Sequence, residues 1–160
     1  MGNSRDTTKR HILSLSYGKD SLACLGAIER LGWPLDGIVH AELWATDTIP
    51  ADLPPMVEFK KRADAIIKAR WGLEVEYYWP TRAEGIVGEN VTYEQCFYRT
   101  MTAGKFIGRI KGFPMVKGNW CTKLKLNALK NSTSGDDVGR VYIGIAADEP
   151  VRLNRLDGKS

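Results

Sequence analysis

The segment from Ile12 to Ser21, with the sequence Ile-Leu-Ser-Leu-Ser-Tyr-Gly-Lys-Asp-Ser, constrains the fold of this chain more than any other part. Its largely apolar first half predicts a buried strand, and helical spacing of apolar residues follows its polar second half. Gly18 permits a tight turn and lets an anion approach main-chain N–H groups, while Ser21 begins a helix whose unpaired amides face that anion. Lys19 adds a mobile positive charge. The segment therefore predicts a phosphate-binding turn between a strand and a helix.

This turn is not a Walker A loop. That motif needs two glycines separated by four residues ahead of Lys-Ser/Thr, whereas Gly18-Lys19 is followed here by Asp20. The alternative to phosphate binding is an ordinary strand-to-helix connection in which Gly18 and Asp20 are the turn and N-terminal residues. Nucleotide binding is the interpretation that the rest of the chain favours.

Strands and helices alternate along the chain. The patterns predict strands at 11–16, 38–45, 73–79 and 141–145, and helices at 21–31, 54–72, 93–102 and 122–130. In the helix that Pro54 opens, we expect Ile66 on the apolar side and Lys60 on the outer side. This order predicts an α/β fold: an open, Rossmann-like parallel sheet flanked by helices on both faces. Ligands bind at the carboxyl ends of such strands, where Ser16 to Ser21, Asp47 and Asp148-Glu149 would lie.

Length and cysteine usage limit the class of protein. We expect the 160 residues to form one domain, 1–160, in a cytosolic protein without a membrane partner, because no apolar stretch is long enough to span a bilayer. Cys24, Cys96 and Cys121 are odd in number and scattered, so we expect no disulfide framework, four-cysteine metal site or iron-sulfur cluster. His11 and His40 fall within strand patterns and are expected to be packed.

Positive charge is concentrated in one part of the chain. The net charge is +4, yet the segment from Gln95 to Gly135 has no Asp or Glu and eight basic residues: Arg99, Lys105, Arg109, Lys111, Lys117, Lys123, Lys125 and Lys130. A solvated basic face is the usual explanation of such an excess. An acid-free segment of this length also suits an anion, and nucleotide phosphates, a sulfate ester and a nucleic-acid backbone all qualify.

Four separated segments resemble, in identity and order, elements of one known family. They are Leu15 to Ser21 with its Ser-x-Gly-x-Asp-Ser pattern, Asp47-Thr48 followed by Pro50 and Phe59, Trp120-Cys121-Thr122-Lys123 with Leu124-Lys125, and Gly144 to Pro150 with Arg152. Together they resemble the phosphoadenosine phosphosulfate (PAPS) reductases, within the adenine nucleotide α-hydrolase superfamily of pyrophosphate-loop enzymes. The resemblance implies the fold of that superfamily.

The resemblance also implies roles for particular residues. An adenine nucleotide (ATP, PAPS or adenosine phosphosulfate) would be bound by Ser16, Tyr17, Gly18, Lys19, Asp20, Ser21, Asp47, Thr48, Trp120, Cys121, Lys125, Asp148 and Glu149. Catalytic roles would fall to Lys19, Asp20, Lys123 and Arg152. The cationic groups among them, on the two lysines and the arginine, can neutralise phosphate or sulfate oxygens. Asp20 and Asp47 would hold Mg²⁺. The alternatives are an Asx-turn for Asp47, core packing for Trp120 and a solvated face for the cations.

The chain also departs from the family's pattern. Ala146 stands where the family has Arg, Tyr17 replaces a small residue, and the 160 residues contain no Glu-Cys-Gly motif with the family's reductive cysteine. Lysines near Cys121 could favour its thiolate, although free cysteines are mostly buried. Three functions stay open: a sulfonucleotide reductase whose thiol comes from a partner, an ATP pyrophosphatase that adenylates a tRNA or DNA base for sulfur modification, and a non-catalytic nucleotide sensor or interaction module. We expect a homo-oligomer.

Overall fold

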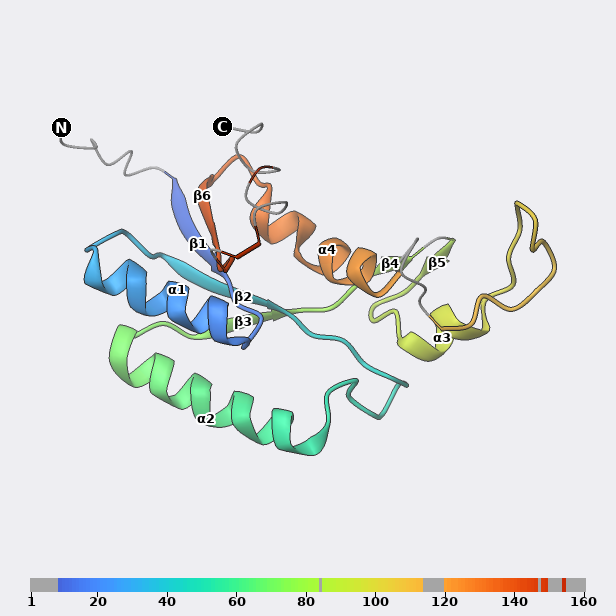
Figure 1. The fold of residues 1–160 in the computed structure, drawn as a ribbon, viewed down its shortest axis with the longest axis horizontal. Helices are drawn as coiled ribbons and strands as arrows, with labels where there is room; N and C mark the ends of the chain where they lie inside the picture. Colours follow the sequence, from blue (N-terminus) through green and yellow to red (C-terminus); the bar gives the residue numbers. More distant parts are fainter. Residues whose placement is uncertain (1–8, 84, 114–119, 147, 150–153, 155–160) are drawn as a thin grey trace.

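The chain folds around one parallel sheet. The computed structural model describes residues 9–83, 85–113, 120–146, 148, 149 and 154. The sheet has four strands in the order β3-β2-β1-β6, all parallel, with bounds β1 (Arg10–Ser14), β2 (Gly37–Ala41), β3 (Val75–Tyr78) and β6 (Val138–Ile143). Helices α1 (Lys19–Arg30) and α2 (Pro54–Trp71) lie on one side of the sheet, and α4 (Trp120–Thr133) lies on the other (Figure 1). The predicted α/β sheet with helices on both faces is confirmed.

Apolar periodicity explains the central elements. Ile12, Leu13 and Ile38 on the two central strands are fully buried, as expected for strands covered on both faces. Leu25 and Ile28 of α1 belong to the same core cluster as Leu13 and Ile38. Two of the expected sequence signals set the bounds of α2: Pro54 and Pro55 occupy its first positions, and Gly72 ends it in the left-handed conformation with φ 70°.

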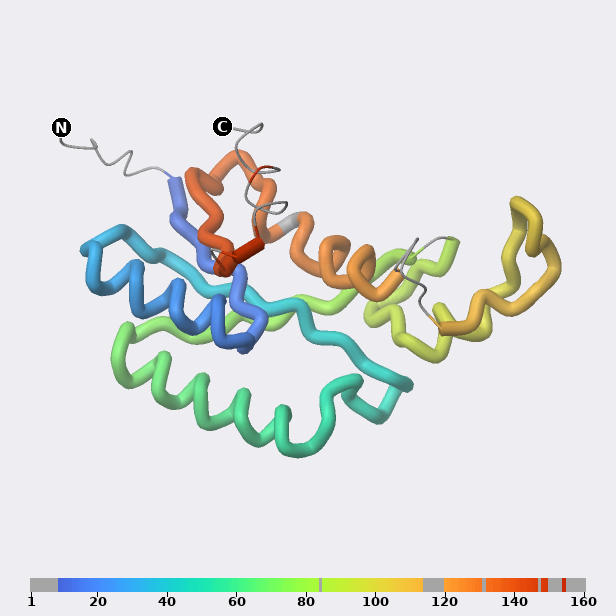
Figure 2. The backbone as a smooth tube through the Cα atoms, in the orientation of Figure 1, coloured from blue at the N-terminus to red at the C-terminus, as the bar shows by residue number. Residues whose placement is uncertain are grey.

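The elements between β3 and β6 differ from the prediction. A short hairpin of β4 (Arg82–Ala83) and β5 (Ile86–Val87), which the sequence pattern did not reveal, follows β3. Helix α3 (Tyr93–Tyr98) begins with a capping box between Thr92 and Gln95 and ends four residues before the predicted bound of Thr102. Residues 99–111 then form a loop that projects away from the sheet, drawn in yellow and orange in Figure 2. The Met101 N–H donates to the Arg109 carbonyl and the Gly108 N–H donates to the Met101 carbonyl, and these two backbone hydrogen bonds close this projecting loop.

The predicted orientation of α2 is wrong at two positions. Lys60, expected on the outer side, is only 5% exposed, whereas Ile66, expected on the apolar side, is 61% exposed. The reason is pairing of charges: the Lys60 ammonium forms ion pairs with Glu42 and Asp52, which follow β2. A buried lysine is tolerated where carboxylates compensate its charge.

The strand order places a topological switch point beside β1. The chain leaves β1 through α1 to β2 and β3, and it reaches the other neighbour of β1, β6, through α4. Ligands of open parallel sheets bind where strand order reverses in this way, outside the carboxyl ends of the strands. The residues after β1 and β6 are therefore the first place to look for a site. None of the helices in the described part of the chain has the length and apolar character needed to cross a membrane.

Candidate functional site

The turn between β1 and α1 is closed by its own serines. The Ser21 hydroxyl accepts a hydrogen bond from the Ser16 N–H at 3.2 Å and donates one to the Gly18 carbonyl at 3.0 Å. Ser21 is buried, so its side chain shapes the turn, whereas Gly18 and Lys19 are exposed. No side chain caps the first amides of α1 at Gly18. These amides and the positive end of the helix dipole are the groups to which anion binding is assigned, and that assignment stays a prediction.

Tyr17, not Gly18, adopts the unusual backbone conformation of this turn. Tyr17 has φ 58°, in the left-handed region, whereas Gly18 has φ −75°. The positive-φ freedom of a glycine is therefore not used at Gly18, and its predicted part in the approach of an anion stays a prediction. The expectation that Gly18 supplies the special dihedral angles is wrong: they occur at Tyr17, a non-glycine residue whose side chain is buried and hydrogen-bonded.

A hydroxyl network holds the Tyr17 side chain below the turn. The Tyr17 hydroxyl donates to Asp64, the Tyr77 hydroxyl donates to the second oxygen of Asp64 at 2.7 Å, and the two hydroxyl oxygens lie 2.7 Å apart. The Tyr17 side chain is 3% exposed, and burial followed by the hydrogen bond to Asp64 raises its pKa. Tyr17 was predicted to contact a nucleotide, and from this position only its backbone can do so.

A hollow of about 100 Å³ lies beside the turn, at the carboxyl end of β2. We call it the strand-end hollow. Residues from five parts of the chain line it: Ser16 of the turn, His40 of β2, Asp52 and Lys60 around the start of α2, Tyr93 of α3, and Lys125 of α4 are among them. Two residues predicted to bind one nucleotide, Ser16 and Lys125, are thus brought to the same hollow.

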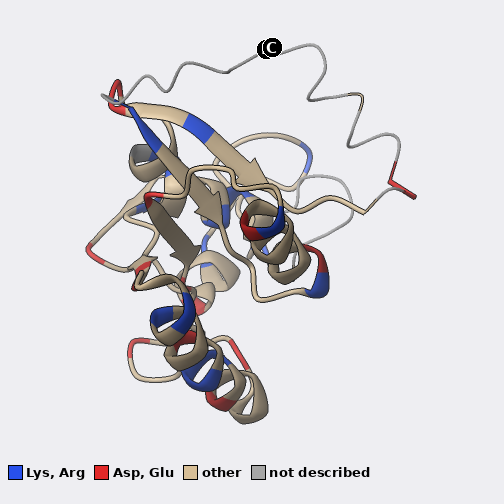
Figure 3. Cartoon of the chain, turned by 90° about the vertical axis from the view of Figure 1, so that its left-hand side faces the viewer, with Lys and Arg blue, Asp and Glu red and all other residues tan. Residues whose placement is uncertain are grey.

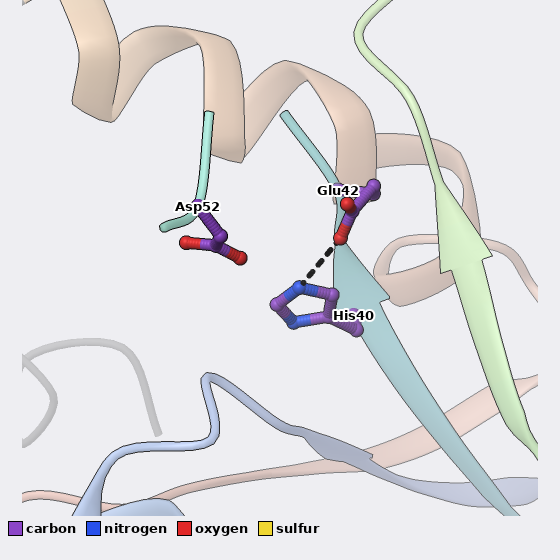
Figure 4. A group of neighbouring side chains, drawn as sticks. All are labelled: His40, Glu42 and Asp52. Carbon is purple, nitrogen blue, oxygen red and sulfur yellow. Dashed lines mark ion pairs between the residues drawn. The ribbon is translucent and has the colours of Figure 1, made fainter. Parts of the chain in front are cut away.

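An ion-paired cluster forms one wall of the strand-end hollow (Figure 4). His40 Nδ1 lies 2.8 Å from the Leu15 carbonyl oxygen, and His40 Nε2 lies 3.3 Å from Glu42 Oε2. The Lys60 ammonium contacts Glu42 and lies 2.7 Å from Asp52 Oδ2. Burial alone would raise the pKa of Glu42, but hydrogen bonds from His40 and Lys60 outweigh it and lower that pKa.

Metal binding was expected at Asp20 and Asp47. Among the described residues, the one group of three or more His, Cys, Asp or Glu side chains whose ligand atoms all lie within 4.8 Å of one another is His40, Glu42 and Asp52. Lys60 already supplies the compensating positive charge in that group, so it fits an ion-paired cluster better than a metal site. The Mg²⁺ prediction for Asp20 and Asp47 stays a prediction.

The other predicted residues occupy several places. Asp47 and Thr48 are exposed in the loop after β2, where the Thr46 hydroxyl accepts a hydrogen bond from the Thr48 N–H at 3.3 Å. Asp148 and Glu149 follow β6, and the Glu149 N–H donates to the Ala146 carbonyl at 3.1 Å. Arg152, together with Lys117 of the basic segment, lies outside the described residues.

Two further hollows flank Trp120, which is buried as the packing alternative predicts. A cationic hollow of about 230 Å³ is lined by residues that include Arg82, Arg99, Lys111, Trp120, Lys123 and Asn127. An aromatic hollow of about 460 Å³ is lined by Tyr93, Glu94, Phe97, Tyr98, Phe113, Trp120 and Cys121. Lys123 and Lys125, predicted to serve one anion, therefore line different hollows.

Cys121 is in a poor environment for a thiolate. Burial raises the pKa of its thiol, and the opposing effects of the Tyr93 hydrogen bond and of Lys125 are smaller. The thiol form therefore dominates near neutral pH, which weakens the interpretation of Cys121 as a nucleophile. The lysines that suggested a thiolate in the sequence do not compensate for this burial.

Comparisons of the chain with protein-family models, with curated proteins and with solved structures find no match. The functional argument therefore starts from the geometry of the chain's own residues. That geometry combines an uncapped helix N-terminus at a switch point with a polar hollow on one side of it. Sequence reasoning missed His40, Glu42, Asp52 and Lys60 in this region, although the His-x-Glu pair at the end of β2 was a signal.

Proposed function

We propose that the chain binds an adenine nucleotide at the carboxyl ends of β1 and β6, as a PAPS reductase-like member of the adenine nucleotide α-hydrolase superfamily. The observation that carries the proposal is the uncapped start of α1, next to a hollow that Ser16 and Lys125 share. Backbone amides of residues 18–21 would bind phosphate oxygens, and Lys19 and Lys125 would neutralise their charge. The choice of an adenine nucleotide, as ATP, PAPS or adenosine phosphosulfate, rests on the four segments that resemble the PAPS reductases.

With a sulfonucleotide, the chemistry is transfer of the sulfonate group to a thiol. A thiolate from a partner protein attacks sulfur, the bond from sulfur to the phosphate oxygen breaks, and the nucleotide phosphate leaves with the bonding electrons. Lys19 and the helix amides stabilise the negative charge that collects on the leaving phosphate. Asp20 and Asp47 would hold a Mg²⁺ ion that screens the phosphates, and Arg152 would add a further positive charge.

A second candidate is an ATP pyrophosphatase that adenylates a base of tRNA or DNA. The observation that favours it is the cationic hollow and the aromatic hollow on the two sides of Trp120, which one nucleotide in the strand-end hollow would not occupy. The raised pKa of Cys121 also makes its thiol a weaker candidate for the nucleophile in the reductase interpretation.

Nucleotide binding is tested by calorimetry with ATP, PAPS and adenosine phosphosulfate. We expect Lys19→Gln and Lys125→Gln each to weaken binding by about tenfold or more, since a charge-assisted hydrogen bond contributes roughly 1.5–3 kcal/mol. Gly18→Val should also weaken it, because its side chain would stand where the ligand approaches. Lys61→Gln, an exposed charge change on α2, is the matched control and should have no effect. Binding that survives all three site variants would refute the assignment.

Reductase chemistry is tested by sulfite release from PAPS in the presence of thioredoxin. We expect the 160 residues to give no sustained release, because they hold no Glu-Cys-Gly motif and the Cys121 thiol stays protonated. Steady sulfite production that Cys121→Ser abolishes and Cys24→Ser preserves would contradict this expectation and make Cys121 the nucleophile.

A further inference from the structure

We propose that this chain forms a two-fold dimer in which the projecting loop of each copy docks into the aromatic hollow of the other. In this dimer the Phe106 ring enters the hollow, and the two cations beside it, Lys105 and Arg109, face Glu94 of the second copy. The inference lies beyond nucleotide binding and does not depend on it. It rests on the exposed side chains of the loop, the lining of the hollow and the charges on each.

The projecting loop exposes large apolar side chains. Phe106 is 48% exposed, Ile107 is 65% exposed and Ile110 is 56% exposed. They belong to the segment of the chain that extends beyond α3, away from the sheet (Figure 2). Exposed apolar side chains that gather in one place are typical of surfaces that contact another protein.

The projecting loop is held in shape by its own backbone. Besides the two hydrogen bonds of Met101, the Lys111 N–H donates to the Arg99 carbonyl at 2.9 Å. Thr100 and Ile110 form an antiparallel bridge between the same two halves of the loop. The loop is therefore a hairpin. Because this hairpin is formed before it docks, little chain entropy is lost on binding.

The aromatic hollow is lined by rings that remain exposed. Its volume is about 460 Å³, and its lining includes Phe113, which is 80% exposed, and Tyr98, which is 62% exposed. Phe97 makes edge contacts with both, with ring centroids 4.9 Å from Phe113 and 5.0 Å from Tyr98. Aromatic rings favour such edge contacts, so a further ring can add to this pattern.

The hairpin holds the tip of the loop, residues 104–108, away from the hollow of its own chain. Tyr98 and Phe113, which line the hollow, flank the loop at its two ends, so the hollow lies at the base of the hairpin. The tip is at the opposite end, since the backbone bonds join the two halves of the loop. The loop of a second copy is not restricted in this way. Because both copies carry both surfaces, two identical contacts form around a two-fold axis.

The loop and the hollow carry opposite charges. Lys105 Nζ and Arg109 Cζ lie 5.9 and 5.8 Å from the centroid of the Phe106 ring. Glu94 lines the aromatic hollow and is exposed. Insertion of the ring therefore brings two cations toward a carboxylate. This complementarity favours a second copy of the chain as the occupant of the hollow.

Tyr93 connects the aromatic hollow to the nucleotide site. Its side chain lines the strand-end hollow as well as the aromatic hollow, and its ring packs edge-on against Trp120 with centroids 5.3 Å apart. A loop docked from the second copy would therefore border a side chain that also lines the proposed nucleotide site. Each nucleotide site would then lie next to a dimer contact.

Analytical ultracentrifugation over a roughly hundredfold range of protein concentration tests the dimer. We expect the mass to rise from that of one chain to that of two as the concentration increases. Phe106→Ser/Ile107→Ser on the loop and Tyr98→Ser/Phe113→Ser in the hollow should each raise the dissociation constant at least about tenfold. Each double variant removes the same contact twice in a two-fold dimer.

Ile66→Ser is the matched control. Ile66 is 61% exposed on α2, at the end of the molecule opposite the projecting loop, where Figure 3 shows charges of both signs along the helices and Arg70 pairs with Glu29. The change removes an exposed apolar side chain, as Ile107→Ser does, without altering the loop or the hollow. The dissociation constant should therefore stay unchanged.

Reversal of the charges gives the sharper test. Glu94→Lys alone, and Lys105→Glu/Arg109→Glu alone, each bring like charges together in both contacts and should leave the protein monomeric. When these two variants are mixed, the loop of each meets the opposite charge in the hollow of the other. A mixed dimer should therefore form, and misfolding of either variant could not produce it.

Wild-type protein that stays monomeric at every concentration overturns the proposal. A dimer that neither serine double variant weakens, or one that Ile66→Ser abolishes, also overturns it, because the contact then lies elsewhere. If the protein is monomeric and Tyr98→Ser/Phe113→Ser weakens its binding of labelled oligo-U, the hollow belongs instead to the nucleic acid of the second candidate function.

Discussion

Lys60→Met is expected to destabilise the protein by about 3–5 kcal/mol, the usual cost of leaving a buried charge without its partner. The Lys60 side chain is buried, and its ammonium pairs with Glu42 and Asp52. Methionine keeps most of the side-chain volume of lysine but none of its charge, so the loss of unfolding free energy reports on the ion pairs of Lys60. Urea denaturation of the variant and of wild type gives the difference in the free energy of unfolding.

The same variant should change the pH dependence of stability. In wild type the pKa of Glu42 lies below its ordinary value of 4.5, so its contribution to stability is present above pH 4.5 and is lost as the pH falls through the lowered pKa. Without Lys60, only His40 opposes the effect of burial, so the pKa of Glu42 should rise from its wild-type position and less of this stabilisation should remain near neutral pH. The difference in the free energy of unfolding between wild type and Lys60→Met should therefore become smaller at acidic pH. Lys61→Met, which removes the exposed lysine that follows Lys60, is the control. If Lys60→Met lowers the free energy of unfolding no more than Lys61→Met does, the ion pairs of Lys60 contribute little to stability.

Gly144→Ala is expected to separate the end of β6 from the start of α1. A Cβ at this position would lie 2.4 Å from the Asp20 carbonyl oxygen and 2.6 Å from the Ser21 nitrogen. These are backbone atoms that no rotamer change can move, so the chain itself must shift. We expect the free energy of unfolding to fall by about 1–3 kcal/mol. Because the shift falls on the first turn of α1, nucleotide affinity should fall with it.

Gly26→Ala provides the matched control for this substitution. A Cβ at Gly26, in α1, would have no atom within 4 Å, and alanine favours a helix over glycine by roughly 1 kcal/mol. The control should therefore be neutral or stabilising. Thermal and urea unfolding, followed by nucleotide titration of each variant that folds, make the comparison. A Gly144→Ala protein as stable as wild type, with unchanged nucleotide affinity, would mean that this contact does not position the turn.

The predictions that held depend on neighbours in the sequence. The strand, turn and helix from Ile12 to Ser21 were predictable because apolar periodicity and a polar turn occur side by side. The ends of α2 were predictable for the same reason, since prolines and Gly72 restrict the backbone where they stand. Parallel order followed from the alternation of strands and helices.

The predictions that failed depend on partners far away in the chain. Nothing near Lys60 in the sequence shows that Glu42 and Asp52 will fold over it, and nothing near Tyr17 reveals Asp64 and Tyr77. Lys123 and Lys125 are two positions apart on a helix, where side chains point in different directions, so residues of one motif line two hollows. Their predicted role at one anion stays a prediction. The aromatic hollow is formed by side chains of α3 and α4 together with Phe113, which lie apart in the sequence.

The hydroxyl network under Tyr17 also has a thermodynamic consequence. The turn is already in its left-handed conformation in the free protein, fixed from below by side chains of α2 and β3. A ligand that arrives there does not have to order the backbone, so little of the binding free energy is lost to chain entropy. We therefore expect association rates typical of rigid partners and a heat-capacity change limited to the surface that the ligand itself covers.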